Sequence, residues 1–496
     1  MAKNFVPCDR EQQLLMPPSL DEWLPQDHLV WFVIEAVDEL DLSAFYRCHR
    51  DDGWGRAAFD PRMIVTLLLY SYAKGIRSAR EMERRLLEDV AFRVIAANER
   101  LDHSTICRFR QRHRDALAAM FVDVLRLCVR AGVIDARVIA IDGTKIEANA
   151  SQNRNVTDEQ LADHVRRVLD EADAIDAEED ERFGERRGDE LPEHLIDRHK
   201  RLEWIRDQLA RQVEERGPVT ARGKPRQINT TDPDSGVLMG PGGFLQGYNA
   251  QLAVTEDQFI VAAQLSSSGA DRVHFTPMVA ATLANLATAD ADTPIEAIVA
   301  DAGYYSEANA SVEGAGDIVI PPASQKRLKQ GALALRDADA HHKRRRHQDR
   351  VQEWNRRADV IERGVADDVP LHQVAQGLGV QKPWASTLRK QFREGGRDAI
   401  TGRAGPPSPQ SITQNMFERV ASPAGRALYE IRGRSVEPVF GQLKEARGVR
   451  RFLHRGLTMC AAEWKLVAAA HNLRKAWVTT CQPLWGFSGW LCPTVV

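Results

Sequence analysis

Three carboxylates of this 496-residue chain occupy positions that suit metal chemistry. Asp142 follows the apolar run VIAI, Asp301 follows the apolar run AIVA, and Glu437 lies in the basic segment RSVEPVFGQLK. An aspartate is unfavourable in a strand, so a ligand role would explain its place after an apolar run. Oxygen ligands in an incomplete protein cage suit Mg²⁺ or Mn²⁺. Two such ions about 3.5–4 Å apart can promote an in-line phosphoryl displacement.

Each of these acids also fits an ordinary structural role. Asp142 precedes Gly143, and Asp followed by Gly is common in turns. A glutamate such as Glu437 in a basic helix commonly forms a salt bridge. The separations of 159 and 136 residues between successive acids favour neither explanation. The residues alone leave both explanations open. The three acids together favour a metal site more strongly than any one of them does alone.

One segment near the C-terminal end is strongly basic, although the net charge of the chain is only −3. Residues 431–478 carry ten Lys or Arg and three Glu, which gives this segment a charge of +7. Such a local excess is typical of proteins that bind phosphate groups. The whole-chain charge alone would not have indicated a nucleic-acid partner.

The first 130 residues have the pattern of a helical domain. Ser78 and Glu81 have the spacing of a capping box, and Asp102 is a good N-cap residue. Short helices followed by an arginine-rich helix predict a reader of DNA that resembles a helix-turn-helix. A plain helical bundle with a solvated basic face fits equally well. The arginines of the last helix include Arg108, Arg110, Arg112 and Arg114.

Residues 131–326 alternate strand and helix signals and predict an α/β fold with a mixed sheet. Strands are expected at 138–142, in a hairpin over 246–266, before Asp301, and in DIVIPP, with a helix near 272–288. A charge-dense segment at about 152–225 interrupts the core. Its helical periodicity fits two antiparallel helices or an arm, and also a solvated excursion.

Residues 327–420 form a second, basic and helical insertion. A helix-turn-helix is predicted at about 369–395, with Gly379 in the turn and Pro383 in the first turn of the second helix. Arg389 and Lys390 would lie along that second helix, with Lys382 and Arg393. We expect the unit to bind DNA rather than merely pack.

The cysteines and the termini indicate the compartment. The seven cysteines include no CxxC pair, so neither a zinc site nor a disulfide framework is expected. The N-terminus lacks the apolar segment of a signal peptide, and no apolar run is long enough to cross a bilayer. A cytoplasmic protein without a membrane partner is therefore predicted.

Five segments, taken together, resemble the DDE transposases of bacterial insertion sequences. They follow the order of that family, cover most of the chain, and are specific as a set. The segments are RMIVTLLLYSYAKGIRSAREMERRLLEDVAFRVI with LDHSTICRFRQRH, then IDGTKIEANAS, then NTTDPDS with GYNAQLAV, then VADAGYYS, and last YEIRGRSVEPVFGQLKEARGVRRFLHRG.

The resemblance implies a fold and a division into domains. The expected fold is α/β, a ribonuclease H-like mixed-sheet core with a helical N-terminal DNA-binding domain and helical insertions. The core would comprise residues 131–326 and 421–478, the latter carrying the Glu437 helix, and residues 479–496 would form a tail.

The resemblance also implies roles for the three acids. Asp142, Asp301 and Glu437 match the catalytic, metal-binding acids of the family and would hold two Mg²⁺ or Mn²⁺ ions. Catalysis of this kind needs positioning and charge neutralisation rather than a covalent intermediate.

The last segment resembles the Y-R-E-K signature of the family. Lys444, seven residues after Glu437, matches its lysine. Tyr429 and either Arg432 or Arg434 match its other members. Tyr429 precedes Glu437 by eight residues, whereas the signature usually has seven. The expected DNA contacts are Lys444, Arg434, Arg432, Tyr429, Arg450, Arg451, Arg108, Arg110, Arg112, Arg389 and Lys390.

The function implied is that of an insertion-sequence transposase. Such a protein binds the element ends in double-stranded DNA and catalyses metal-dependent cleavage and strand transfer, and a homodimer is expected because two ends are cut in one complex. The alternative is an inactive or domesticated transposase that only binds DNA. A structure-selective nuclease on the same fold is a third possibility, which the specific motifs disfavour.

Overall fold

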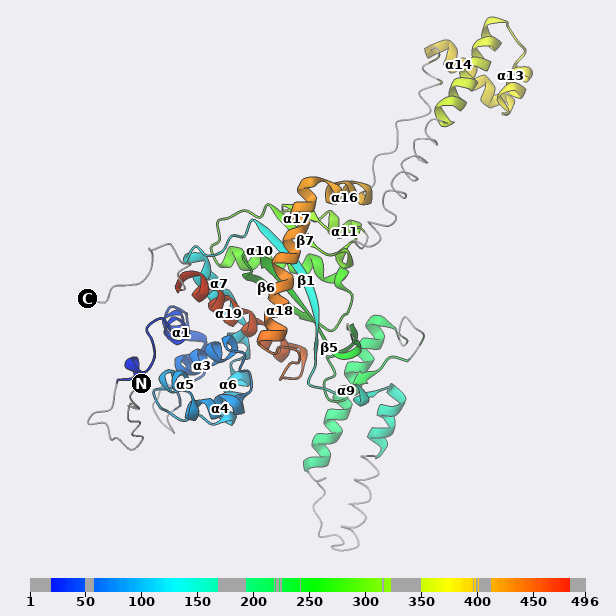
Figure 1. Cartoon of the computed structure of the whole chain (residues 1–496). Coiled ribbons are helices and arrows are strands. Elements are labelled where there is room, and N and C mark those ends of the chain that lie inside the picture. The colour runs from blue at the N-terminus through cyan, green and yellow to red at the C-terminus, as the bar shows by residue number, and fades with distance from the viewer. Residues whose placement is uncertain are drawn as a thin grey trace, which may run out of the picture. The chain divides into compact units, whose positions relative to one another are not determined.

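The computed structural model describes five stretches of the chain (Figure 1). The chain divides into two compact units. The first unit comprises Met1–Tyr304, Val312–Val319 and Gly425–Val496, and the second comprises Tyr305–Ser311 and Ile320–Ala424. The described residues are 19–49, 58–167, 193–322 except 218, 220–222, 224, 241 and 315, 349–400 except 396, 398 and 399, and 412–481.

A mixed six-stranded sheet forms the centre of the first unit. The strands lie in the order β4-β5-β1-β7-β8, and β6 pairs with β5. β1 is antiparallel to β5 and parallel to β7, and β7 is parallel to β8. The predicted α/β class with a mixed sheet is confirmed. The strands are β1 (Val138–Glu147), β4 (Gly236–Gly240), β5 (Gly243–Thr255), β6 (Ile260–Ser266), β7 (Ala297–Ala300) and β8 (Asp317–Val319).

The hairpin predicted over 246–266 is formed by β5 and β6. The chain turns between Thr255 and Ile260, where Gln258 has a φ of 67°. β5 is buried without interruption from Gln246 to Thr255, so both of its faces are covered. Apolar residues such as Val254 therefore pack on either side, as expected for a strand in the middle of a layered α/β structure.

β1 continues past Asp142, so the prediction that this strand ends there in a turn is wrong. Its pairing with β5 runs from Ile139 opposite Thr255 to Glu147 opposite Gly247. The thirteen-residue β5 supplies ladder partners beyond the aspartate, and this long pairing outweighs the low strand propensity of Asp142. An added Cβ at Gly143 would lie 2.2 Å from Gln251 Nε2, so any other residue here would displace that side chain.

Helices from both ends of the chain pack around the sheet. The long helix α19 (Leu457–Cys481) contacts β6, α3 (Pro61–Ala73) and α7 (Arg114–Arg130). The Asn472 side chain in α19 completes the edge of β6, since its amide nitrogen donates to Ile260 O and its oxygen accepts from Ile260 N. α10 (Phe275–Thr288) follows a short 3-10 turn at Asp271–His274 and packs against β5 and β6. It is the helix that the sequence predicted near 272–288.

The glutamate segment forms two consecutive helices close to β1. α17 (Pro423–Arg434) and α18 (Val436–Gly441) are interrupted at Ser435, and a π-helical segment, Gln442–Ala446, follows. α18 contacts β1 and β5 (Figure 1). Helical interruptions and π segments are often found at functional sites.

The N-terminal region is helical, as predicted. Asp60 and Asp102 cap α3 and α6 by accepting from the Arg62 and Thr105 amides. The predicted capping box of Ser78 is wrong, because Ser78 makes no side-chain cap bond and its partner acid pairs with arginines of its own helix instead. The helices are α1 (Leu29–Asp38), α2 (Ser43–Tyr46), α3 (Pro61–Ala73), α4 (Ala79–Glu88), α5 (Val90–Ile95) and α6 (His103–Arg112).

The first insertion contains helices with a small apolar cluster. A helix over 158–167 and α9 (Glu193–Arg216) flank residues that lie outside the described part. Leu161, Ile205 and Leu209 are buried together. The short strands β2 (Asn155–Val156) and β3 (Ile228–Asn229) complete the cluster.

The second unit contains the predicted helix-turn-helix. α13 (Leu371–Leu378) and α14 (Lys382–Gly395) are joined through Gly379, whose φ of 65° is left-handed and favours glycine. These helices share a buried core with a helix over 349–366. The unit also contains α11 (Glu307–Ala310) and α16 (Ile412–Ala421).

The described helices include none with the length and apolar character that a bilayer crossing requires. Of the predicted tail, 479–496, the first three residues continue α19 to Cys481. Residues 482–496 lie outside the described part of the chain.

Candidate active site

Asp142 and Asp301 are brought together by the parallel pairing of β1 and β7. The last register pair is Ile141 with Ala300, so the two acids occupy the next position of neighbouring strands. Asp142 Oδ1 accepts from the Gly143 amide at 2.8 Å, and Asp301 Oδ1 accepts from the Gly303 amide at 2.8 Å. Two acids that are 159 residues apart in sequence therefore meet at one edge of the core.

Arg432 connects Glu437 to Asp142. Its guanidinium donates to Asp142 Oδ2 at 2.8 Å and to Glu437 Oε1 at 2.9 Å. The side chains of Arg432 and Asp142 are only 17% and 14% exposed, while that of Glu437 is 53% exposed. Hence one arginine from α17 holds the strand acid and the helix acid on the same side of β1.

The pKa of Asp142 is raised to about 6, mainly by burial, with a further contribution from the negative charge of Asp301. Arg432 and the Gly143 amide oppose this shift because both stabilise the carboxylate. Burial alone would lower the pKa of Arg432, but Asp142, Tyr429 and Asp301 raise it. The site thus concentrates negative charge that one arginine compensates only in part.

The structure distinguishes the two candidate arginines of the signature. Arg434 points elsewhere and pairs with Glu256 at 2.6 Å, whereas Arg432 contacts two of the three acids. The helix is interrupted at Ser435, between Arg432 and Glu437, and such an interruption can accommodate the additional residue of this chain.

Tyr429 and Lys444 flank the acids. The pKa of Tyr429 is raised by burial and by Asp301 and Asp142, and Arg432 opposes this shift. Lys444 in the π segment donates to Thr144 Oγ1 and to Lys145 O, so it is anchored on β1 close to Asp142. Burial lowers the pKa of Lys444.

The donor types fit a hard divalent cation, although no closed ligand cage is formed. Among the described residues, no three or more His, Cys, Asp or Glu side chains are grouped so as to hold a metal ion. Asp142 and Asp301 offer neighbouring carboxylates, and the raised pKa of Asp142 reflects burial and repulsion that a cation would relieve. Glu437 would join them by exchanging its bond to Arg432.

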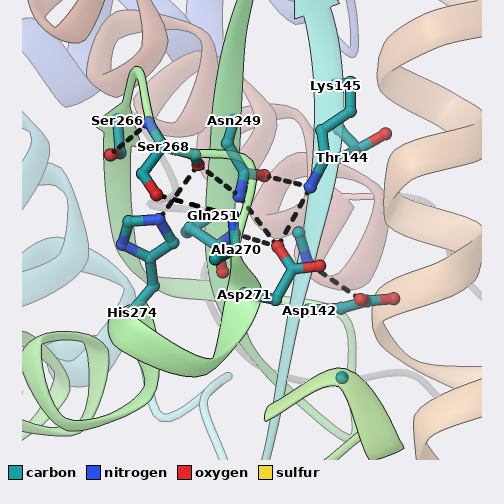
Figure 2. Close-up of polar contacts among 12 residues, drawn as sticks. Asp142, Thr144, Lys145, Asn249, Gln251, Ser266, Ser268, Ala270, Asp271 and His274 are labelled. Atoms are coloured by element: carbon teal, nitrogen blue, oxygen red, sulfur yellow. Dashed lines mark hydrogen bonds and ion pairs between the residues drawn. The ribbon is translucent and has the colours of Figure 1, made fainter. Parts of the chain in front are cut away.

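A second polar network, which was not predicted from the sequence, lies on the other face of β1. Figure 2 shows Lys145, Asn249 and Gln251 directed toward Asp271. These residues lie in the IDGTK and GYNAQL segments and at the start of the helix after the hairpin. Polar side chains inside otherwise apolar strands were the signal that could have revealed the network.

Comparison with known families gives two matches to transposase domains. Residues 18–112 match a Transposase domain (DUF772), and residues 400–477 match a Transposase DDE domain. These two matches support a DDE transposase of the insertion-sequence type. No curated protein and no solved structure shows significant similarity to this transposase. The DDE match contains Glu437 and Lys444, and the other match ends at Arg112.

The basic loop after the π segment lies beside a cavity at the far end of β1. Arg451 pairs with Glu147 at 3.2 Å, and Arg450 pairs with Glu445. The cavity of about 490 Å³ is lined by polar side chains together with Arg154, Arg451 and Arg455. The transposase thus presents several arginines about five residues along β1 from Asp142.

The predicted arginines of α6 have different environments. Arg108 is exposed and bonds the hydroxyl oxygens of its own helix, and Arg112 is exposed and donates to Cys48 O. Arg110 is buried, donates to Arg77 O at 2.9 Å and lies over the Tyr72 ring. Arg110 therefore has a structural role.

The helix-turn-helix shows the same contrast between neighbours. Arg389 is 13% exposed and donates to Gly364 O at 2.7 Å and to Val369 O at 3.1 Å. Lys390 is 76% exposed and lies 3.8 Å from Glu394. Lys390 can reach a partner molecule, while Arg389 ties α14 to the preceding helix and loop.

Proposed function

We propose that this transposase binds the ends of its insertion sequence and catalyses metal-dependent DNA cleavage and strand transfer. One observation carries the proposal: the β1–β7 register and Arg432 together gather Asp142, Asp301 and Glu437 on one side of β1. The three acids come from distant segments, and a fold that only needed turns or surface salt bridges would not require them to converge.

In this proposal, Asp142, Asp301 and Glu437 hold two Mg²⁺ or Mn²⁺ ions. Bound divalent cations supply charge neutralisation and activation of oxygen nucleophiles. Arg432 keeps Asp142 and Glu437 close together, and Lys444 holds the π segment against β1. Tyr429 and Lys444 would contact the DNA backbone next to the scissile phosphate.

The remaining DNA contacts are assigned to exposed basic residues. Arg450 and Arg451 lie in the loop after Glu437, Arg108 and Arg112 lie on α6, and Lys390 lies on α14. We assign residues 1–130 and 369–395 to recognition, and residues 131–326 with 421–478 to chemistry. A homodimer would bring two element ends into one complex.

One observation favours the alternative of a transposase that only binds DNA. The Arg432 guanidinium already pairs with both Asp142 and Glu437, so these acids have a structural partner without any cation. If that pairing is permanent, the acids serve the fold rather than the chemistry.

The deciding experiment is a cleavage and strand-transfer assay with the full chain and labelled DNA that carries the flanking element ends. We expect cutting and joining in Mg²⁺ or Mn²⁺ but not in EDTA. Asp142→Asn and Glu437→Gln should abolish both reactions and leave DNA binding intact. The matched control is Glu256→Gln, which removes the partner of Arg434 outside the site. Tight DNA binding without cleavage in either metal would support the binding-only alternative.

A further inference from the structure

The two faces of β1 carry different polar residues. Asp142 and Thr144 meet Arg432 and Lys444 on one face. Because side chains alternate along a strand, Gly143 and Lys145 lie on the other face. There, Lys145 is paired in register with Asn249, and Gly143 with Gln251.

Three donors on this second face converge on one oxygen of Asp271. Asp271 Oδ1 accepts from Asn249 at 2.8 Å, from Lys145 at 3.0 Å and from Gln251 at 3.2 Å (Figure 2). The Lys145 and Asp271 side chains are 14% and 28% exposed, and Asn249 and Gln251 are buried. A buried polar cluster of this kind is costly unless its members are paired, and once paired it is rigid.

The network extends to the segment that carries Asp301. Gln251 Oε1 accepts from the hydroxyl of Tyr304, which is fully buried. The Tyr304 amide in turn donates to Asp301 O at 3.2 Å. A continuous set of hydrogen bonds therefore joins the strand of Asp142, through Asp271, Gln251 and Tyr304, to the turn of Asp301.

We propose that Asp271 is a positioning residue of the transposase, which fixes the separation of Asp142 and Asp301 from the opposite face of the sheet. This inference rests on the proposed metal-dependent function, because the separation of the two acids matters for a shared cation. Asp271 needs no contact with DNA or with the cation in this role. It acts through β1, β5 and the Asp301 turn.

The first test is the Mn²⁺ affinity of the full-length Asp271→Asn variant, measured by isothermal titration calorimetry without DNA. Asparagine keeps the size of the side chain but removes the charge that pairs with Lys145. Loss of a supporting partner behind metal ligands commonly weakens metal affinity by about tenfold or more, and we expect about tenfold here. Affinity for element-end DNA in EDTA should be unchanged.

Tyr304→Phe is the second variant, and it removes only the hydroxyl bonded to Gln251. It should weaken Mn²⁺ binding in the same direction, and it keeps the test decisive if Asp271→Asn fails to fold. The matched control is Asp123→Asn, because Asp123 forms an ion pair of similar exposure with Arg126 in α7, away from the site. The control should bind Mn²⁺ like the wild type.

Hydrogen–deuterium exchange separates failure of this inference from failure of the proposed function. In both variants, the backbone amides of β1 and of the Asp301 turn should exchange faster than in the wild type. In the control variant, their exchange should be unchanged. Wild-type Mn²⁺ affinity in Tyr304→Phe would overturn the positioning role. If the wild type itself binds no Mn²⁺, the proposed metal-dependent function fails. Hydrogen–deuterium exchange then tests the positioning role by itself, and unchanged exchange in Tyr304→Phe overturns that role as well.

Discussion

In the first unit, Arg77 and Glu463 form a buried ion pair at 2.8 Å that joins the loop before α4 to α19. In the helix-turn-helix unit, Lys390 and Glu394 pair at 3.8 Å with both side chains largely exposed. Buried pairs fix a geometry, because a buried charge without a partner is costly. Exposed pairs contribute little to the free energy of unfolding and leave their charges available to a partner molecule. The Arg77–Glu463 pair therefore stabilises the packing of α19, whereas the charge of Lys390 stays available to a partner molecule.

The largest expected effect comes from breaking the buried pair. Glu463 Oε1 accepts from Arg77, and its Oε2 accepts from the Leu453 amide and from His454 Nδ1, both at 3.0 Å. Glu463→Gln leaves Arg77 buried with reduced compensation, so we expect the unfolding free energy to fall by about 3–5 kcal/mol. Chemical denaturation of the full chain measures this loss. The exposed pair broken by Asp163→Asn is the control, and an equal loss there would contradict the comparison.

Low pH should cause part of the same loss of stability. Burial opposes ionisation of Glu463, but His454, Arg77 and the Leu453 amide outweigh it and lower its pKa below the usual 4.5. A lowered carboxyl pKa stabilises the folded state above about pH 4.5, and this contribution is lost as pH falls through the lower folded pKa. Stability below pH 4.5 should therefore fall more steeply in the wild type than in Glu463→Gln. Parallel curves would show that Glu463 has no part in acid unfolding.

An intermediate effect is expected from Arg389→Ala in the second unit. This guanidinium bonds two carbonyl oxygens and is largely buried, so its removal leaves Gly364 O and Val369 O without that donor. Loss of charge-assisted hydrogen bonds of this kind costs about 1.5–3 kcal/mol. Hydrogen exchange over residues 349–400 should show the loosening. Arg393→Ala, in the same helix but exposed, should change nothing. Equal exchange in the two variants would remove the distinction between them.

The smallest effect should come from Lys390→Ala, and it should appear in DNA binding rather than stability. A phosphate contact contributes about one unit to the slope of log affinity against log salt. We expect the slope to decrease by about one, with unchanged thermal stability, in a salt titration against duplex DNA. Lys390→Arg keeps the charge and should keep the slope. An unchanged slope in the alanine variant would leave the helix-turn-helix as a packing unit.

The sequence predicted elements that depend on local patterns. The apolar run before Asp301, the β5–β6 hairpin and the turn at Gly379 all follow from propensities within a few residues, and each is present. The continuation of β1 beyond Asp142 could not be predicted locally, because it depends on the length of its partner β5.

Side-chain partners were harder to predict than elements. The choice of Arg432 over Arg434 depends on the interruption at Ser435, which Pro438 could have indicated, because a proline disrupts the helical turn before it. Lys145 and Asp271 are 126 residues apart, so only the folded sheet brings them together. A helical period, by contrast, could have revealed that Arg110 points inward, since it follows the buried Ile106 by four residues.

The arrangement of the core also bears on synthesis of the protein. Asp142 and Asp301 are translated early, but α17 and α18, with Arg432 and Glu437, emerge from the ribosome only after the whole second unit. A nascent chain on the ribosome thus contains two acids without the arginine and the glutamate that complete the group. If this transposase cuts DNA as proposed, a nascent chain would lack the complete set of acids until α17 and α18 fold against β1.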